Sequence, residues 1–266
     1  MNIKEPARET PVVGECEVLV LGGGPAGIAA AAAAARSGRS TMLIERYGFL
    51  GGMGTAAGVT NFCGLHANVH GEVRQVVHGV ADELLERIAR LGGLSEPHSL
   101  FKGKIKAQAY DNAAYKIAAD DLLLSSGIKI SFHALATGCA MRSEREIQAI
   151  FIETKSGRGA ILAKMFIDCS GDGDLAAWAG APYEKGDGHG GMLYPSTMFR
   201  INGVDPKRAG EAWKRFDALL EEAARRGKRF PRKQPIIRPQ KHDIEWRVNV
   251  TQLSNQIGRA SCRERV

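Results

Sequence analysis

Residues 16–45, which read CEVLVLGGGPAGIAAAAAAARSGRSTMLIE, constrain the fold more than any other part of the chain. A short apolar run at 18–21 stops at a glycine cluster, and a small-residue helical pattern follows over 25–37. A second apolar run at 42–44 then ends in an acid, Glu45. This order predicts a strand, a tight turn, a helix and a second strand, which together open an α/β domain.

Three glycines of the turn, Gly22, Gly24 and Gly27, stand in G-x-G-x-x-G register. The first allows the tight turn, the second lets the backbone approach a pyrophosphate, and the third lets the helix pack closely on the strand. The helix N-terminus presents free N–H groups and the positive end of its dipole to phosphates. Glu45 follows at the end of the second strand, where its carboxylate can accept hydrogen bonds from both ribose hydroxyls. The stretch therefore predicts a dinucleotide site and not an ordinary glycine loop.

Two further glycine-rich segments have a functional and a structural interpretation. The loop at 46–55 has four glycines in seven residues, so its backbone can run along a flat ligand, or it can be a flexible surface loop. Its place directly after Glu45 favours the first interpretation. A second strand–glycine–helix junction lies at 165–180, with Asp172 and Asp174 at the predicted helix start. These acids either cap the helix or mark a second cofactor contact.

Hydrophobic periodicity and turn residues predict the other elements. In the first half of the chain they are a helix over 72–91, a loop at 95–108, and a helix capped by Asp111 that runs to Ser126. A strand at 128–132 and a hairpin of 149–154 and 160–166 follow. The last predicted elements are a strand at 193–203, a helix from Pro206 with Trp213 and Phe216 in the core, and a strand at 245–252.

Composition excludes several classes of protein. The net charge is +7, but the excess lies mainly between residues 205 and 247, where 13 Lys and Arg face 7 Asp and Glu without interleaved aromatic residues. This distribution argues against nucleic-acid binding. The N-terminal residues do not read as a signal peptide, and the alanine run is too weakly apolar to span a membrane. Five cysteines without C-x-x-C spacing indicate neither a metal site nor a disulfide framework, which suits a reducing cytoplasm.

Four motifs resemble the FAD-dependent oxidoreductase family, whose FAD domain is glutathione-reductase-like and which is related to heterodisulfide reductase A and fumarate reductase flavoproteins. They are GGGPAGIAAA, IERYGFLGGMGTAAGV, FIDCSGDGDLAAWAGAP and STMFRINGVDP. The resemblance runs from about Cys16 to Thr251. It implies an α/β fold, with a Rossmann-like FAD/NAD(P)-binding domain of parallel sheet and β-meander and part of a substrate domain. We expect the FAD domain at 10–190 with inserted helices at 72–126, and the partial substrate or cap domain at 191–256.

The resemblance also implies FAD as the cofactor and assigns its contacts. The pyrophosphate would be held by Gly22, Gly24, Pro25, Ala26 and Gly27. The adenosine ribose would be held by Glu45 with Arg46 beside it, and Gly51, Gly52 and Met53 would lie along the dinucleotide. Backbone near Ala136 would contact the adenine, and Asp172 and Gly173 would lie close to the pyrophosphate and ribityl region.

One departure from the family concerns the C-terminus. Family members continue through the substrate domain and return to the FAD domain with a segment that contacts the flavin, and nothing after Thr251 resembles that segment. The resemblance therefore implies the N-terminal portion of a longer flavoprotein, cut near Asn255. Residues 257–266, which are basic and without apolar period, are interpreted as a non-native or disordered tail that includes Cys262.

Catalytic residues are weakly indicated. Cys63 and His66 are the only polar candidates near the glycine-rich loop, and a buried structural cysteine and a satisfied histidine are the competing interpretation. His189 is a weaker candidate for substrate contact. Arg200 either binds an anionic substrate or lies on the solvent face of a strand. The favoured hypothesis is an FAD-dependent oxidoreductase acting on a small molecule, with an electron-transfer partner. The alternatives are an oxidoreductase that uses NAD(P) alone and a non-catalytic flavin-binding subunit.

Overall fold

The computed structural model describes residues 2–3, 6–100, 105–187, 189, 191–230 and 236–252. The predicted tail at 257–266 and the predicted cut near Asn255 lie outside the described residues. The chain divides into two compact units. Unit 1 comprises Met1–Gly52 and Lys116–Pro182, and unit 2 comprises Met53–Tyr115 and Tyr183–Val266. The predicted domain boundaries at 10–190 and 191–256 stay a prediction.

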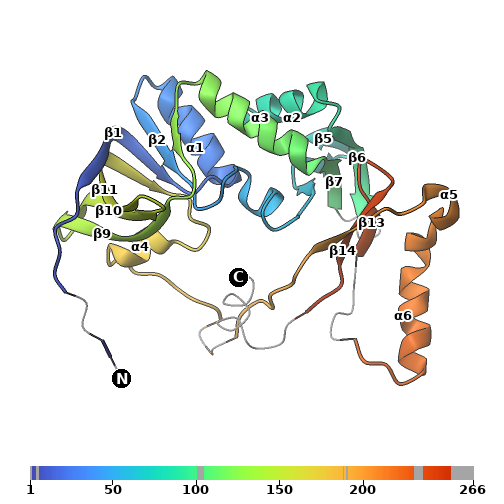
Figure 1. The fold of residues 1–266 in the computed structure, drawn as a ribbon. Coiled ribbons are helices and arrows are strands. Elements are labelled where there is room, and N and C mark those ends of the chain that lie inside the picture. Colours follow the sequence, from blue (N-terminus) through green and yellow to red (C-terminus); the bar gives the residue numbers. More distant parts are fainter. Residues whose placement is uncertain are drawn as a thin grey trace. The chain divides into compact units, whose positions relative to one another are not determined.

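Unit 1 contains a six-stranded sheet in the order β8-β2-β1-β11-β10-β9 (Figure 1). Its strands are β1 (Val12–Leu21), β2 (Thr41–Ile44), β8 (Lys129–Ser131), β9 (Leu135–Ser143), β10 (Glu146–Thr154) and β11 (Gly157–Asp168). The pairs β8–β2, β2–β1 and β1–β11 are parallel, whereas β11, β10 and β9 form an antiparallel meander. The predicted combination of parallel sheet and β-meander is thereby confirmed.

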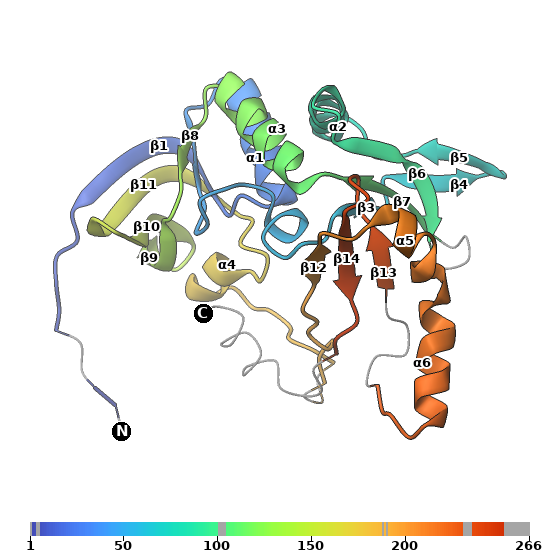
Figure 2. The same cartoon turned by 45° about the vertical axis from the view of Figure 1, so that its right-hand side comes forward.

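Helices cover both faces of this sheet. Helix α1 (Pro25–Arg36) packs against β1, β2 and β11, and α4 (Asp174–Trp178) packs against β9 and β11. Figure 2 shows α1 and α4 on opposite faces. Along β1, Leu19 and Val20 are both fully buried, because neighbouring residues of a strand point to opposite faces and both faces are covered. The local sequence of 16–45 therefore forms the predicted strand, turn, helix and strand.

Two other predicted elements of this part of the chain are confirmed. Asp111 caps α3 (Asn112–Ser125), since its Oδ1 accepts a hydrogen bond of 2.8 Å from the Ala114 N–H. Strands β10 and β11 pair as a hairpin in which Thr154 lies opposite Gly157. The turn between them is therefore only Lys155-Ser156, shorter than the predicted link.

Unit 2 contains three small antiparallel sheets, in the orders β12-β14-β13, β3-β7-β6 and β4-β5. Their strands are β3 (Asn61–Cys63), β4 (His66–Val69), β5 (Glu72–Gln75), β6 (Leu94–Leu100), β7 (Ile105–Tyr110), β12 (Phe199–Asn202), β13 (Ile236–Pro239) and β14 (Glu245–Asn249). Phe62, Tyr110 and Tyr115 form an aromatic cluster in which the two tyrosine rings meet edge to face, with centroids 5.1 Å apart.

Two predictions for unit 2 are wrong. The helix expected over 72–91 is β5 followed by α2 (Val80–Arg90), because Gly71 and Gly79 adopt positive φ and interrupt the chain. The Asp82 carboxylate accepts a hydrogen bond from the Gly79 N–H, which starts α2 there. The loop expected at 95–108 is the β6–β7 hairpin, in which Pro97 lies at a register shift, where a strand tolerates a missing N–H donor.

The helix expected from Pro206 is interrupted. Asp205 caps α5 (Pro206–Ala209) as predicted, but Gly210 at φ 48° ends it, and a 3₁₀ turn η2 (Ala212–Arg215) precedes α6 (Phe216–Arg225). No residue of α6 is buried. Trp213 and Phe216 are half-buried and so are not the core residues that the periodicity predicted.

Two of the predicted strands are shorter in the structure. The strand expected at 193–203 begins only at Phe199, and the one expected at 245–252 ends at Asn249.

Candidate functional site

The candidate nucleotide site of unit 1 lies where the parallel strands end. The N–H of Gly22 donates to the Ile44 carbonyl at 2.8 Å, and the N–H of Cys169 donates to the Leu21 carbonyl at 2.8 Å. The N–H of Glu45 donates to the Ser131 carbonyl at 2.9 Å. These bonds join the carboxyl ends of β1, β2, β8 and β11. In open α/β sheets, this edge is where ligands bind.

The three motif glycines have different structural roles. A Cβ on Gly22, which has φ +99°, would lie 2.2 Å from the Cys169 carbonyl oxygen, and a Cβ on Gly27 would lie 1.8 Å from the Gly22 carbonyl oxygen. The packing of the protein itself therefore requires both glycines. A Cβ on Gly24 would meet only the Gly52 Cα, at an ordinary 3.8 Å. The open space at Gly24 leaves its backbone accessible to a ligand.

The start of α1 is suited to an anion. Gly24 is the N-cap and supplies no side chain, and Pro25 follows at the first helical position. The Ile28 N–H donates to the Gly24 carbonyl at 2.9 Å, which closes the first turn. The N–H groups of Ala26 and Gly27 precede that bond and so have no acceptor within the helix. Together with the helix dipole they favour a negatively charged group.

The Glu45 carboxylate points at the glycine turn. It is 5% exposed, and its Oε2 accepts a hydrogen bond of 2.7 Å from the Gly23 N–H while its Oε1 accepts one of 2.8 Å from the Tyr47 N–H. Each oxygen keeps a second lone pair, so the carboxylate can still accept hydrogen bonds from a ligand. Gly23 was not singled out in the sequence. A Cβ there would lie 2.5 Å from the Leu50 side chain and 3.1 Å from Oε2.

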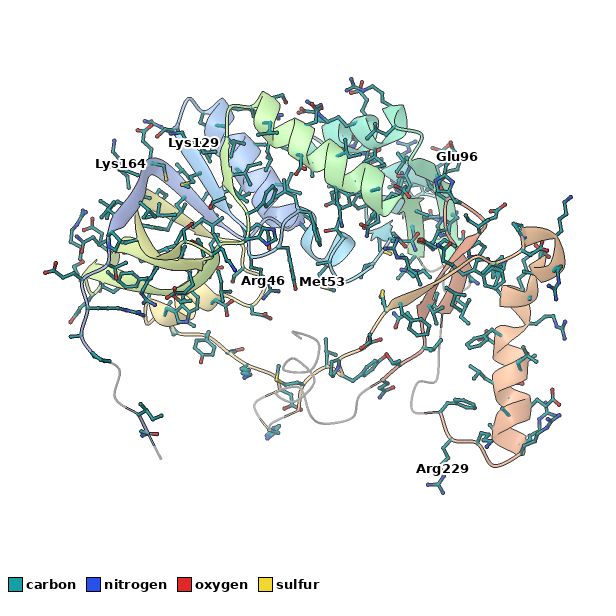
Figure 3. The ribbon with its side chains drawn as sticks, in the orientation of Figure 1. Arg46, Met53, Glu96, Lys129, Lys164 and Arg229 are labelled. Atoms are coloured by element: carbon teal, nitrogen blue, oxygen red, sulfur yellow. The ribbon has the colours of Figure 1, made fainter. Side chains whose placement is uncertain are left out.

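The loop after Glu45 packs on the turn. The Gly51 N–H donates to the Gly23 carbonyl at 2.8 Å, and a Cβ on Gly52 would lie 2.8 Å from the Gly24 Cα. Leu50 is fully buried, and Arg46, labelled in Figure 3, stacks its guanidinium 4.9 Å from the Tyr47 ring centre. Residues 50–52 of the loop therefore pack on the glycine turn, whereas residues 46–48 lie exposed at the surface. Met53 belongs to unit 2, where it is exposed.

At the junction between β11 and α4, the carboxylate that binds the start of the helix belongs to Asp168, which the sequence did not indicate. Asp168, at the end of β11, accepts hydrogen bonds from the Ser170 N–H at 2.9 Å and the Ala176 N–H at 3.0 Å. Burial raises the pKa of Asp168, but these bonds outweigh it and hold the pKa below its ordinary value. Asp172 is exposed, and the N-cap of α4, Gly173, has no side-chain cap. Asp172 is therefore not the N-cap of α4, and Asp174 is its first residue, an acid in the first turn.

Ala136 lies in β9 opposite Ile152, half-buried against the core of unit 1. The backbone that contacts the Glu45 loop lies just before Ala136 in the sequence. The N–H groups of His133 and Ala134 donate to the carbonyls of Tyr47 and Glu45. The predicted adenine contact at Ala136 stays a prediction.

The catalytic candidates belong to unit 2. Cys63 is exposed at the end of β3, and partial burial of its thiol raises its pKa although Arg247 opposes the shift. His66 starts β4, and no other part of the described chain gives its buried Nδ1 a hydrogen-bond partner. Of the weaker candidates, His189 donates its backbone N–H to Asp187, and Arg200 pairs with Glu245 at 3.0 Å.

Within the described residues, no group of three or more His, Cys, Asp and Glu side chains is placed to hold a metal ion. In the same part of the chain, no helix has the length and apolarity needed to cross a membrane.

Comparison with known proteins identifies one family model and several solved structures of similar fold. A family model described as FAD dependent oxidoreductase matches residues 17–263. No curated protein is significantly similar to the chain. A solved structure of a geranylgeranyl bacteriochlorophyll reductase-like protein from Thermoplasma acidophilum is 16% identical, with a TM-score of 0.53 over 89% of this chain and 56% of that one. The structure of CabE, an aromatic hydroxylase from angucycline biosynthesis, is 15% identical, with a TM-score of 0.51 over 89% and 44%.

These likenesses show the fold alone. The chain spans about half the length of these two solved structures.

Proposed function

The chain belongs to the FAD dependent oxidoreductase family, and on that premise we propose that unit 1 binds the ADP portion of FAD at the carboxyl ends of β1, β2, β8 and β11. The observation that carries the proposal is the contrast among the motif glycines. Gly22 and Gly27 are required by the protein's own packing, whereas the space at Gly24 is used by no protein atom closer than 3.8 Å. An open backbone position at an uncapped helix N-terminus fits a pyrophosphate.

The N-terminus of α1 holds the pyrophosphate in this proposal. The N–H groups of Ala26 and Gly27 donate to phosphate oxygens, and Gly24 lets these oxygens come close to the backbone. Pro25 removes one donor but fixes φ for the first helical residue. The group is held by backbone, so the site needs no basic side chain.

Glu45 holds the adenosine ribose. Its two bonds to backbone N–H groups fix the carboxylate, so that its remaining lone pairs are oriented before a ligand arrives. A ribose with free 2′- and 3′-hydroxyls donates to such a carboxylate, as in FAD and NAD⁺. The 2′-phosphate of NADP⁺ would bring like charges together and is disfavoured. Arg46 and Gly51 to Met53 are proposed to lie along the dinucleotide, and Asp172 and Gly173 near its pyrophosphate.

When bound, FAD supplies a flavin that exchanges a hydride or electrons with a small-molecule substrate. The residues of unit 1 position that group and exclude water. Because the pKa of Cys63 is raised, its thiol is protonated at neutral pH, which argues against a thiolate role. The described cysteines, Cys16, Cys63, Cys139 and Cys169, are all free, which supports a reducing compartment such as the cytoplasm.

A competition titration tests the proposal. FAD is added to the flavin-free chain while flavin fluorescence is followed, and ADP, NADP⁺ and riboflavin are added as competitors. We expect ADP to displace FAD, because the turn and Glu45 hold the adenosine half, and we expect NADP⁺ and riboflavin to compete at least tenfold less well. Binding of NAD⁺ without uptake of FAD would instead favour an enzyme that uses NAD(P) alone. FAD binding that ADP does not compete with would refute the proposed site.

A further inference from the structure

Three arginines stand in one row across the β12-β14-β13 sheet of unit 2, which Figure 2 shows as three neighbouring strands. Arg247 of β14 lies directly opposite Arg200 of β12 on one side and Arg238 of β13 on the other. Residues directly opposite each other in an antiparallel ladder project from the same face, and like charges in such positions repel. This face therefore carries a local excess of positive charge that needs compensation.

The two outer arginines have partners within the protein. The Arg200 Nη1 donates to both oxygens of the Glu245 carboxylate, at 3.0 and 3.3 Å. The Arg238 guanidinium lies 4.1 Å from the centre of the Trp213 ring, and its Nη1 donates to the Ile237 carbonyl at 3.3 Å. A cation over an aromatic face and an ion pair both stabilise a guanidinium.

The central arginine differs from both. Arg247 is 4% exposed, and its buried Nε has no hydrogen-bond partner among the described residues. The charged and titratable groups that act on it are Cys63, Tyr110 and Arg238, none of which is an anion at neutral pH. Asp217 acts electrostatically on Arg238, and Glu245, two residues before Arg247 on β14, pairs with Arg200. A guanidinium stays protonated in proteins, so a buried one without a counter-charge is costly.

Further basic side chains act at the same place. His98 of β6 is influenced by Arg238, Arg247 and Lys106, and burial together with these cations holds its pKa below the ordinary value. Cys63, exposed at the end of β3, acts electrostatically on Arg247. Arg238, Arg247 and His98, from β13, β14 and β6, therefore act on one another electrostatically, whereas Glu245 of the same sheet is paired with Arg200.

We propose that Arg247, with Arg238 beside it, binds an oxoanion, namely the carboxylate or phosphate group of a small molecule. The planar guanidinium fork matches either group through two parallel hydrogen bonds. The proposal concerns unit 2 alone and does not depend on FAD binding by unit 1. Arg200, which the sequence suggested for an anionic substrate, is already neutralised by Glu245 and is not part of the site.

Thermal unfolding and calorimetric titration test this site. The wild-type chain, Arg247→Met and a matched control, Arg225→Gln on the exposed surface of α6, are compared in sodium succinate, sodium phosphate and sodium chloride of equal ionic strength. We expect succinate, phosphate or both to raise the wild-type Tm above that in chloride. Arg247→Met should weaken the affinity for that anion roughly tenfold or more, whereas Arg225→Gln should stay within about twofold. Preference for succinate assigns a carboxylate ligand, and preference for phosphate assigns a phosphate.

The unliganded variant gives a second readout. If Arg247 has no counter-charge within the protein, Arg247→Met replaces an unpaired buried charge by an apolar side chain of similar volume. The Tm of this variant in sodium chloride should therefore be equal to or higher than that of the wild type. A lower Tm or an unfolded Arg247→Met variant would show that the charge is already satisfied within the protein, and would overturn the proposal. An anion response that survives in Arg247→Met would also overturn it. Binding of FAD should be equal in the wild type and in Arg247→Met, which separates this test from that of unit 1.

Discussion

Two alanine substitutions in the same glycine motif should have opposite consequences. Gly24 has φ −71° and ψ −178°, an extended conformation that alanine adopts freely, and the new Cβ would meet only the Gly52 Cα at 3.8 Å. Alanine is a poorer N-cap than glycine, but it also lowers the entropy of the unfolded chain by a similar free energy. We expect Gly24→Ala to change the free energy of unfolding by no more than about 0.5 kcal/mol.

The same methyl group should weaken FAD binding. It occupies the space that the proposed site leaves for the pyrophosphate, and so it separates phosphate oxygens from the N–H groups of α1. Losing one charge-assisted hydrogen bond costs about 1.5–3 kcal/mol, which corresponds to roughly a 10- to 150-fold weaker affinity.

Gly27→Ala should instead disrupt the fold of unit 1. Its Cβ would lie 1.8 Å from the Gly22 carbonyl oxygen, and neither that carbonyl nor the Gly27 Cα can move freely, because the strand and the helix fix the backbone. Relief requires the turn and α1 to separate by more than about 1 Å, and overpacking of this kind costs about 3 kcal/mol. We expect the Tm to fall by roughly 6–12 °C.

Circular dichroism melting curves and the fluorescence titration with FAD measure the two effects on the same samples. If Gly24→Ala folds normally and binds FAD as tightly as the wild type, the backbone at Gly24 does not contact the pyrophosphate. If Gly24→Ala loses as much stability as Gly27→Ala, the distinction drawn between the two glycines is mistaken.

Three other predictions follow from the contacts of single side chains. Asp168→Asn should lower the free energy of unfolding by about 1–2 kcal/mol at pH 7, because an amide cannot accept from both backbone N–H groups. The native pKa of Asp168 is below the unfolded one, so the extra stability of the wild type is complete above the unfolded pKa and disappears as pH falls through the native pKa. Urea titrations at pH 7 and pH 3 measure the difference in free energy of unfolding between the wild type and Asp168→Asn. An equal difference at both pH values would contradict the role of the Asp168 carboxylate. Tyr110→Phe should cost about 1–3 kcal/mol in the same urea assay at pH 7, because the hydroxyl lies within hydrogen-bond reach of the Gly54 and Val59 carbonyls in a buried position. Alkylation of Cys63 by iodoacetamide at pH 7 should be slower than that of a free cysteine peptide, because the pKa of the Cys63 thiol is raised. The Cys63→Ser variant measures the alkylation of the other cysteines. A Cys63 rate at or above that of the peptide would refute the prediction.

The strand–turn–helix unit that carries the candidate nucleotide site was predictable because its information is local. The strand, turn, helix and acid of 16–45 follow one another within a single supersecondary unit. Helix α1 and strand β2 have nearly the predicted bounds, whereas β1 begins at Val12, six residues before the apolar run at 18–21. Asp111 and Asp205 cap their helices for the same reason, since a cap and its N–H groups are separated by only a few residues.

Errors arose where a periodic pattern competed with turn residues. The apolar spacing over 72–91 fits a helix, but the hairpin turn at Gly71 and the helix start at Gly79 divide the segment. The same competition ends α5 at Gly210. Periodicity describes which face of an element would be apolar, and it does not show where the backbone must turn.

By itself, the sequence determined the class of fold, the family and the position of the glycine turn between β1 and α1, because these depend on the order of neighbouring residues. Only the tertiary structure decided which groups far apart in the chain meet: the Glu45 carboxylate on the Gly23 N–H, the Asp168 carboxylate on the start of α4, and three arginines in one row across β12, β14 and β13. Strand register and helix packing determine which of these groups come into contact. Both are fixed by the burial of side chains from the whole unit, which a local pattern does not contain.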